Sequence, residues 1–186
     1  MGFSVHGHYA ATLAAFLLAA PVRAEEAGVV RLEAELSASH SATQMLTERC
    51  AALKLASPPA IRAVRDKSAD PKAGPDIRKL LGVNADTRLG YRRVKLTCGT
   101  HVLSEADNWY VPERLTPEMN RTLDTTEIPF GTVVRPLDFH RKTVKMETLD
   151  DPAHALRVTA LLLTGGGTPF SLVVENYSRE LAGGKP

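Results

Sequence analysis

The sequence predicts an α+β fold, in which a single antiparallel sheet of about five or six strands packs against helices on one or both faces. Three observations predict it. Residues 93–98 alternate polar and apolar side chains, as a half-buried strand does. Residues 41–44 form a capping box, which opens a helix. The apolar runs 156–163 and 170–177 flank three glycines, as the arms of a β-hairpin flank its turn.

The other elements follow from apolar periodicity and from turn residues. Residues 29–36 fit either a strand or the first turns of a helix, and the helix that begins at Ser41 should end near Leu55, before Ser57-Pro58-Pro59. The remaining assignments, in order, are a strand at 61–65, a polar loop at 67–74, a short helix at 75–81 stopped by Gly82, strands at 88–98 and 101–111, a helix from Thr116, an apolar stretch at 132–137 and a strand at 139–149.

Residues 1–24 resemble a secretory signal peptide, and residues 25–186 form the predicted domain. The run from Tyr9 to Val22 is apolar, and Val22-Arg23-Ala24 places small residues where a signal peptidase cuts. The leader has no Lys or Arg before this run, and the run is shorter than the ~20 residues of a spanning helix, which disfavours a membrane anchor. We expect a periplasmic or secreted protein that has no membrane association after cleavage.

The charge balance argues against a nucleic-acid partner. Removing residues 1–24 leaves a formal net charge of +1, one less than the whole chain of 186 residues. Only 5% of the residues are aromatic, too few for a base-stacking platform. One ordinary globular domain remains, and we expect it to be a monomer.

The two cysteines invite a disulfide in an exported chain. Cys50 lies on the apolar side of the first helix pattern, and Cys98 lies on the apolar side of the strand at 88–98. If that helix packs on that face, the thiols meet and a bond closing about 50 residues contributes roughly 4 kcal/mol. The alternative is two buried thiols that act as small apolar side chains.

Arg93 is the first candidate site residue. It alternates with Val94, Leu96 and Cys98, which build the core, so it lies on the opposite face of the strand. That face either meets water or, if a helix covers it, holds the guanidinium against an anionic ligand.

Glu175 is the second candidate, because it follows the consecutive apolar residues Leu172, Val173 and Val174. A strand of that kind is buried on both faces, so the carboxylate must find a hydrogen-bond donor or lose its solvation. Such a group suits proton transfer or acceptance of a ligand hydroxyl. The alternative is that the strand leaves the core there and Glu175 is solvated.

No metal site is expected. The histidines at 40, 101, 140 and 154 are scattered and form no His-x-His or His-x-x-x-His pair. Ser104 lacks the Gly-x-Ser-x-Gly context of a hydrolase nucleophile.

Taken together, the order of elements resembles the chorismate pyruvate-lyase family and its superfamily, which includes effector domains of bacterial transcription regulators. The most specific part is the interval from Arg93 to Val111-Pro112, together with Pro129-Phe130-Gly131. The resemblance implies a six-stranded antiparallel sheet with helices covering an internal ligand cavity. It also implies a lyase that converts chorismate to 4-hydroxybenzoate and pyruvate without a cofactor.

The same resemblance assigns roles to four residues. Arg93 would bind a substrate carboxylate, Phe130 and Gly131 would contact the ligand through the turn, and Glu175 would lie near the ring hydroxyl. Arg93 and Glu175 would be the catalytic pair.

The chain departs from the lyase pattern in three places. Ala42 replaces a larger apolar residue, Asn108 replaces an arginine, and the stretch from Pro169 to Glu175 is one residue longer, which can reverse the face that Glu175 occupies. Chorismate is also a cytoplasmic metabolite. An exported, non-catalytic binding module for a small aromatic or hydroxy carboxylic acid is therefore the alternative to a lyase.

Overall fold

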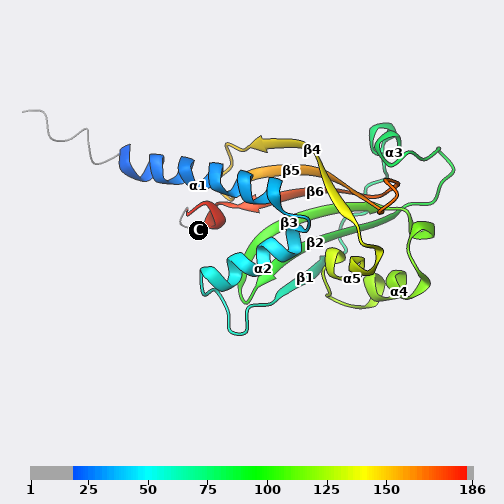
Figure 1. Ribbon diagram of the computed structural model, residues 1–186, viewed down its shortest axis with the longest axis horizontal. Helices are drawn as coiled ribbons and strands as arrows, with labels where there is room; N and C mark the ends of the chain where they lie inside the picture. The colour runs from blue at the N-terminus through cyan, green and yellow to red at the C-terminus, as the bar shows by residue number, and fades with distance from the viewer. Residues whose placement is uncertain (1–18, 184–186) are drawn as a thin grey trace, which may run out of the picture.

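The computed structural model describes residues 19–183 and confirms the predicted α+β class. One antiparallel sheet of six strands runs through the molecule in the order β1-β2-β3-β6-β5-β4 (Figure 1). The strands are β1 (Ile61–Asp66), β2 (Gly90–Cys98), β3 (His101–Tyr110), β4 (His140–Thr148), β5 (His154–Leu163) and β6 (Pro169–Ser178). The helices are α1 (Ala19–Ala38), α2 (Ala42–Ala52), α3 (Pro75–Leu81), α4 (Pro117–Thr125) and α5 (Phe130–Val133).

The sheet consists of two three-stranded meanders that join through β3 and β6. Each meander connects neighbours in sequence, and the β5–β6 pair is the hairpin expected from the three glycines. In the middle, Ala106 of β3 pairs with Glu175 of β6. This pairing brings a residue from each half of the chain to the centre of the sheet, where the site lies.

The helices α1 and α2 cover one face of the sheet, which we call the cavity face; it carries Arg92, Val94 and Leu96 (Figure 1). Residues 29–36, which fitted either a strand or a helix, are helical because Val29, Leu32 and Leu36 recur on one side and pack on that face. Ser41 caps α2 as expected, accepting the Gln44 N–H at 3.4 Å. The helix ends at Ala52, three residues before the expected position.

The remaining helices close the end of the sheet away from α1 (Figure 1). Thr116 caps α4 as expected, and Met119 and Leu123 of α4 pack with Tyr110 and Phe170. Residues 132–137 form short helical turns in α5 and a 3₁₀ helix (Arg135–Leu137). The helix α3 packs on the opposite side of the sheet, against Trp109.

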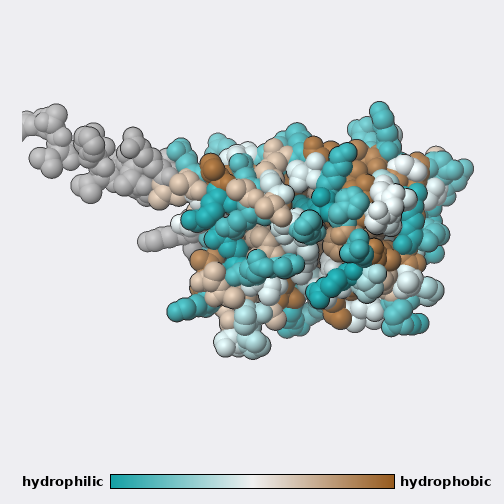
Figure 2. All heavy atoms as spheres, viewed as in Figure 1, coloured by the Kyte–Doolittle hydropathy of each residue, from teal (hydrophilic) through white to brown (hydrophobic). Residues whose placement is uncertain are grey.

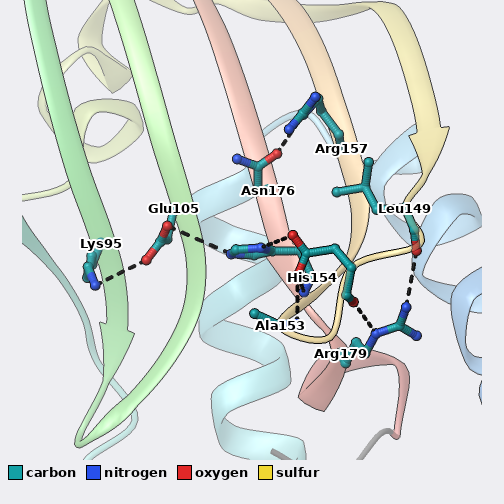
Figure 3. Close-up of polar contacts among 9 residues, drawn as sticks. Lys95, Glu105, Leu149, Ala153, His154, Arg157, Asn176 and Arg179 are labelled. Carbon is teal, nitrogen blue, oxygen red and sulfur yellow. Dashed lines mark hydrogen bonds and ion pairs between the residues drawn. The ribbon is translucent and has the colours of Figure 1, made fainter.

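The opposite side, the outer face, carries Arg93 and Lys95 and is covered only in part. Its charged side chains pair across strands: Lys95 contacts Glu105 at 3.1 Å, and Glu105 lies 3.8 Å from the imidazole of His154 (Figure 3). Arg157 donates to Asn176 at 2.7 Å on the same face (Figure 3). The outer face therefore satisfies its own polar groups across neighbouring strands.

The expected signal peptide lies mostly outside the described residues, which begin at Ala19. The helix α1 runs without a break through Ala24 and Glu25, the expected cleavage point. From Glu25 onward it belongs to the domain: Glu25 pairs with Arg179, and Gly28 packs so closely on Ala182 that a Cβ there would lie 1.8 Å from its carbonyl oxygen. Within residues 19–183, no helix has both the length and the apolar character needed to cross a membrane.

The cysteines at the far end of α2 are joined. Cys50 and Cys98 form a disulfide with a Cα–Cα distance of 6.0 Å, and both are fully buried. The bond ties the C-terminal half of α2 to β2.

Hydrophilic residues and scattered apolar side chains cover the surface that α1 and α2 present to solvent (Figure 2).

Candidate functional site

A small cavity lies between the first turn of α2, the helix α5 and the cavity face of the sheet. Its free volume is about 50 Å³. Its polar wall is formed by Arg92, Asn108, Arg141 and Glu175, and its apolar wall by Val94, Leu96, Phe130, Phe139, Leu162 and Val173. The cavity therefore combines four converging polar groups with an apolar lining, as small-molecule sites do.

Arg92 is the unusual residue in this wall. It is 2% exposed, and its guanidinium donates to the carbonyls of Thr126 and Ile128, each at 3.1 Å. Its Nε has no partner, and no carboxylate in the described part of the chain lies within ion-pairing distance. Burial lowers its pKa to about 10, with the positive charge of Arg65 contributing. Arg92 thus stays charged at neutral pH; the negative charge of Asp124 acts on it from a distance, and no carboxylate of the described residues forms an ion pair with it.

Arg141 and Glu175 form a buried ion pair at 2.8 Å, with side-chain exposures of 3% and 6%. Burial lowers the pKa of Arg141, but the charge of Glu175, the charge of Tyr177 and the hydrogen bond to Glu175 together outweigh it, and the net pKa is raised. Tyr177 donates its hydroxyl to the same carboxylate at 2.8 Å. The pair carries no net charge, so the cavity as a whole holds one positive charge, that of Arg92.

The neutral polar groups of the cavity come from Asn108 and from the first turn of α2. Ser171 donates to the Asn108 side-chain oxygen at 2.6 Å, so this amide is fixed in place. The first turn of α2 presents Ser41, Ala42 and Thr43 to the cavity. The N–H groups of a first helical turn have no partners within the helix, and its dipole favours negative charge. This turn and Arg92 border the same space, which makes it suitable for a carboxylate.

The structure places Arg93 outside this site, and the expectation of an enclosed Arg93 is corrected. Its side chain is 43% exposed on the outer face, where Nε contacts Asp107 at 3.2 Å. Tyr91 donates to the same carboxylate. The reason is the two-residue period of the strand: the helices that roof the site lie on the face of Val94 and Leu96, so they cover Arg92 and leave its neighbour in solvent.

The other expected residues do line the cavity. Phe130 and Gly131 of α5 and Glu175 of β6 all border it. Glu175 is buried, so of the two alternatives for this carboxylate the structure selects the enclosed one, and its partners are Arg141 and Tyr177. The ring of Phe130 is tilted against that of Tyr110, with centroids 5.4 Å apart, and lies nearly parallel to that of Phe170, with centroids 6.4 Å apart.

Two site residues were missed by the sequence reasoning. Arg92 shares the period of Val94, Leu96 and Cys98, so extending the apolar face by one step would have found it. Arg141 gave a weaker signal, because an irregularity between Thr143 and Lys145 shifts the phase of β4 after it. Among residues 19–183, no group of three or more His, Cys, Asp or Glu side chains is placed to hold a metal ion.

Comparison with solved structures shows which known fold the chain shares. The chain superimposes on PhnF from Mycobacterium smegmatis with a TM-score of 0.54, at 12% identity, covering 75% of this chain and 64% of that one. For the effector domain of the same protein the TM-score is 0.50, again at 12% identity, over 64% of this chain and 81% of the domain. The chain therefore has the fold of the PhnF effector domain, and it spans less than two thirds of the PhnF chain.

Sequence comparison places the chain in a family. It is 40% identical over 173 residues to the uncharacterized protein y4mC of Sinorhizobium fredii, which corresponds to 81% of this chain and 73% of the relative. The chain belongs to the y4mC family. No protein-family model matches it.

Proposed function

We propose that this protein binds a small aromatic acid that carries one carboxylate and one hydroxyl group. The observation that carries the proposal is Arg92, a buried cation without a carboxylate partner that borders the cavity beside the first turn of α2. A buried charge without compensation is costly, and a ligand carboxylate supplies the missing negative charge.

The rest of the cavity fits the body of such a ligand. Glu175 accepts hydrogen bonds from Arg141 and Tyr177, and Arg141 balances its charge. A ligand hydroxyl would bind to this carboxylate as one further donor. The aromatic side chains of Phe130 and Phe139 border the space between Arg92 and this pair. The effector domain of PhnF, which shares the fold, is named for response to an effector, which supports a binding role.

Charge balance favours binding over chorismate cleavage. Arg92 contributes one uncompensated positive charge, and the Arg141–Glu175 pair contributes none. A monocarboxylate brings the cavity to neutrality, whereas chorismate, a dianion, leaves one negative charge in a largely apolar enclosure. Asn108 cannot balance it, because it is neutral and already bonded to Ser171.

Binding can be tested by calorimetry with 4-hydroxybenzoate and two neighbouring variants. Arg92→Gln should weaken binding by about 10- to 100-fold, because a hydrogen bond to a charged group contributes about 1.5–3 kcal/mol. Arg93→Gln is the matched control and should bind as the unmodified protein does, since Arg93 lies on the outer face. Equal effects of the two changes, or no binding by the unmodified chain, would refute the proposal.

Chorismate lyase activity is the second candidate, and one observation favours it. Glu175, the carboxylate that the family resemblance places near the ring hydroxyl, does line the cavity. Incubation of the purified protein with chorismate, followed by chromatography for 4-hydroxybenzoate, decides between the two. Product that is lost in Arg92→Gln would support a lyase with no cofactor, and unchanged chorismate would leave the binding role.

The proposal includes location and assembly. The protein would act in the periplasm or outside the cell as a monomer, released from the membrane once the leader is cut. The leader sequence and the disulfide between Cys50 and Cys98 support this, because disulfides persist mainly in oxidising compartments.

A further inference from the structure

A second cleft adjoins the cavity on its solvent side. It has a volume of about 450 Å³. Four residues line both spaces: Ser41, Thr43, Gly131 and Phe139. Ser41 and Thr43 come from the start of α2, and Gly131 and Phe139 come from α5 and the residue before β4. These four residues are therefore the wall between the cavity and the cleft.

The wall closes where Thr43 meets Gly131. A Cβ built on Gly131 would lie 3.0 Å from Thr43 Oγ1, 3.3 Å from Ser41 Oγ and 3.7 Å from Thr43 Cβ. A Cβ at Gly131 would therefore fit only if the side chains of Ser41 and Thr43 moved by a few tenths of an ångström. We call the contact of Ser41 and Thr43 with Gly131 the seam. Within residues 19–183, no hydrogen bond or ion pair joins α2 to α5, so van der Waals contact alone holds the seam.

The two ends of α2 are held very differently. Its C-terminal half is bonded covalently to β2 through Cys50 and Cys98. Its first turn rests on Gly131 without a polar contact. On the other side of the seam, Arg92 holds the segment before α5 by its bonds to Thr126 and Ile128. The contact at the seam is therefore weaker than the bonds that hold the C-terminal half of α2 and the segment before α5.

The volumes of the cavity and of the second cleft indicate that the seam must open to admit a ligand. At about 50 Å³, the cavity is several-fold smaller than a usual ligand site. Ligand sites usually measure about 300–1,000 Å³, a range that the cavity reaches only when joined to the cleft of about 450 Å³. Three other clefts of similar size share no lining residue with the cavity.

We propose that the seam between Thr43 and Gly131 is the door of the cavity. A ligand enters from the second cleft and places its carboxylate at Arg92. The rest of the ligand then lies between α2 and α5, which have moved apart. The bound ligand would thus occupy cavity and cleft together, which selects acids with a ring or a longer apolar body over acetate-sized ones. This inference rests on the proposed binding function and adds its entry route and size class.

The seam can be locked with an engineered disulfide. The 3.7 Å between the built Cβ of Gly131 and Thr43 Cβ lies within the range of about 3.5–4.5 Å found in disulfides. The double change Thr43→Cys/Gly131→Cys should therefore cross-link on oxidation. Each single change, which cannot cross-link, is the matched control for the substitution itself.

Access is measured without any natural ligand, by labelling a thiol inside the cavity. In a Val173→Cys background, a negatively charged methanethiosulfonate should react through the open seam. Oxidation of the cross-link should slow this labelling by about 100-fold, because the open state is a minor population that the lock removes. A thiol introduced by Val102→Cys, at an exposed position outside the cavity, should label at the same rate whether or not the seam is locked.

The outcomes separate the door from the ligand. Fast labelling with the seam locked would overturn the door, whatever binds. Slow labelling in the locked protein, with no 4-hydroxybenzoate binding to the unlocked one, would keep the door and reject the proposed ligand. As a second variant that needs no cross-link, Thr43→Ala removes atoms from the seam and should speed labelling several-fold; an unchanged rate would count against the door.

Discussion

At the scale of single residues, the site depends on a one-residue difference between two adjacent arginines. Arg92 and Arg93 have the same chemistry, but Arg92 is 2% exposed and Arg93 has a side chain 43% exposed. Neighbours on a strand face opposite ways, so only one of them can meet the roof of helices. The residue type cannot tell which arginine is buried. That depends on which of the two points to the face of the sheet that the helices cover.

The Arg141–Glu175 pair should behave as a coupled unit. Arg141→Met leaves Glu175 buried and unpaired, and we expect the free energy of unfolding to fall by about 3–5 kcal/mol. Arg141→Met/Glu175→Gln removes both charges and keeps an acceptor for Tyr177, so it should recover most of that loss. Urea denaturation of the two variants checks this. A double variant as unstable as the single one would contradict it.

Tyr177 should make stability depend on alkaline pH. Burial, and then the negative charge of Glu175, raise its pKa well above the usual value of about 10. The folded protein keeps this proton while the unfolded chain loses it, so the stabilisation is complete below pH about 10 and is lost as pH rises further.

Tyr177→Phe removes this contribution. Between pH about 10 and 11.5, its free energy of unfolding should fall less steeply than that of the unmodified protein, by about 1.4 kcal/mol per pH unit. Tyr91 and Tyr110, whose pKa values burial also raises, and Arg92 act equally in both proteins. Urea denaturation across this range gives the two slopes, and identical slopes would rule out the effect.

At the scale of elements, α2 has two tasks that its sequence separates. Its apolar side, with Met45, Leu46 and Cys50, builds the core, and its first turn builds the wall of the cavity. The capping box predicted where this helix begins, because the cap is a local interaction. The sequence could not show that the same turn faces Arg92, since the two are 50 residues apart and meet only through packing.

The disulfide should contribute a large part of the stability of α2 on the sheet. Cys50→Ala/Cys98→Ala should lower the free energy of unfolding by about 2–4 kcal/mol, because the bond restricts the unfolded chain. Urea denaturation with and without a reductant measures it. Reductant should destabilise the unmodified protein to a similar extent and should leave the double variant unchanged; a reductant effect on that variant would point to another cause.

At the scale of the whole molecule, two meanders of consecutive strands meet at β3 and β6 and bring Arg92, Asn108, Arg141 and Glu175 to one face. These residues are spread over 84 positions of the chain, from 92 to 175. Short turns set the antiparallel pairing of β2 with β3, of β4 with β5 and of β5 with β6, whereas the connection from β1 to β2 is long and contains α3. The pairing of the two halves is a long-range contact, and a single sequence carries no direct signal of it.

Processing is predicted at this scale. If residues 1–24 are a signal peptide as proposed, the full chain expressed in a Gram-negative host should be recovered from the periplasm beginning at Glu25, whose side chain pairs with Arg179 in the folded domain. N-terminal sequencing of the purified protein checks this. Ala24→Arg should block the cut and serve as the control, and a chain found uncut in the cytoplasm would contradict export.

The sequence by itself determined the α+β class and the positions of most strands and helices, because periodicity, caps and turns are local. The apolar run before Glu175 singled out that carboxylate, whereas Phe130 and Gly131 were candidates through the family resemblance. The sequence also indicated an arginine of β2 for the site, but it selected Arg93, which lies on the outer face, whereas Arg92 lines the cavity. Only the tertiary structure decided which face the helices cover, that Arg141 joins Glu175, and that Thr43 rests on Gly131. Those outcomes depend on how distant segments pack, which the local preferences of the chain do not encode.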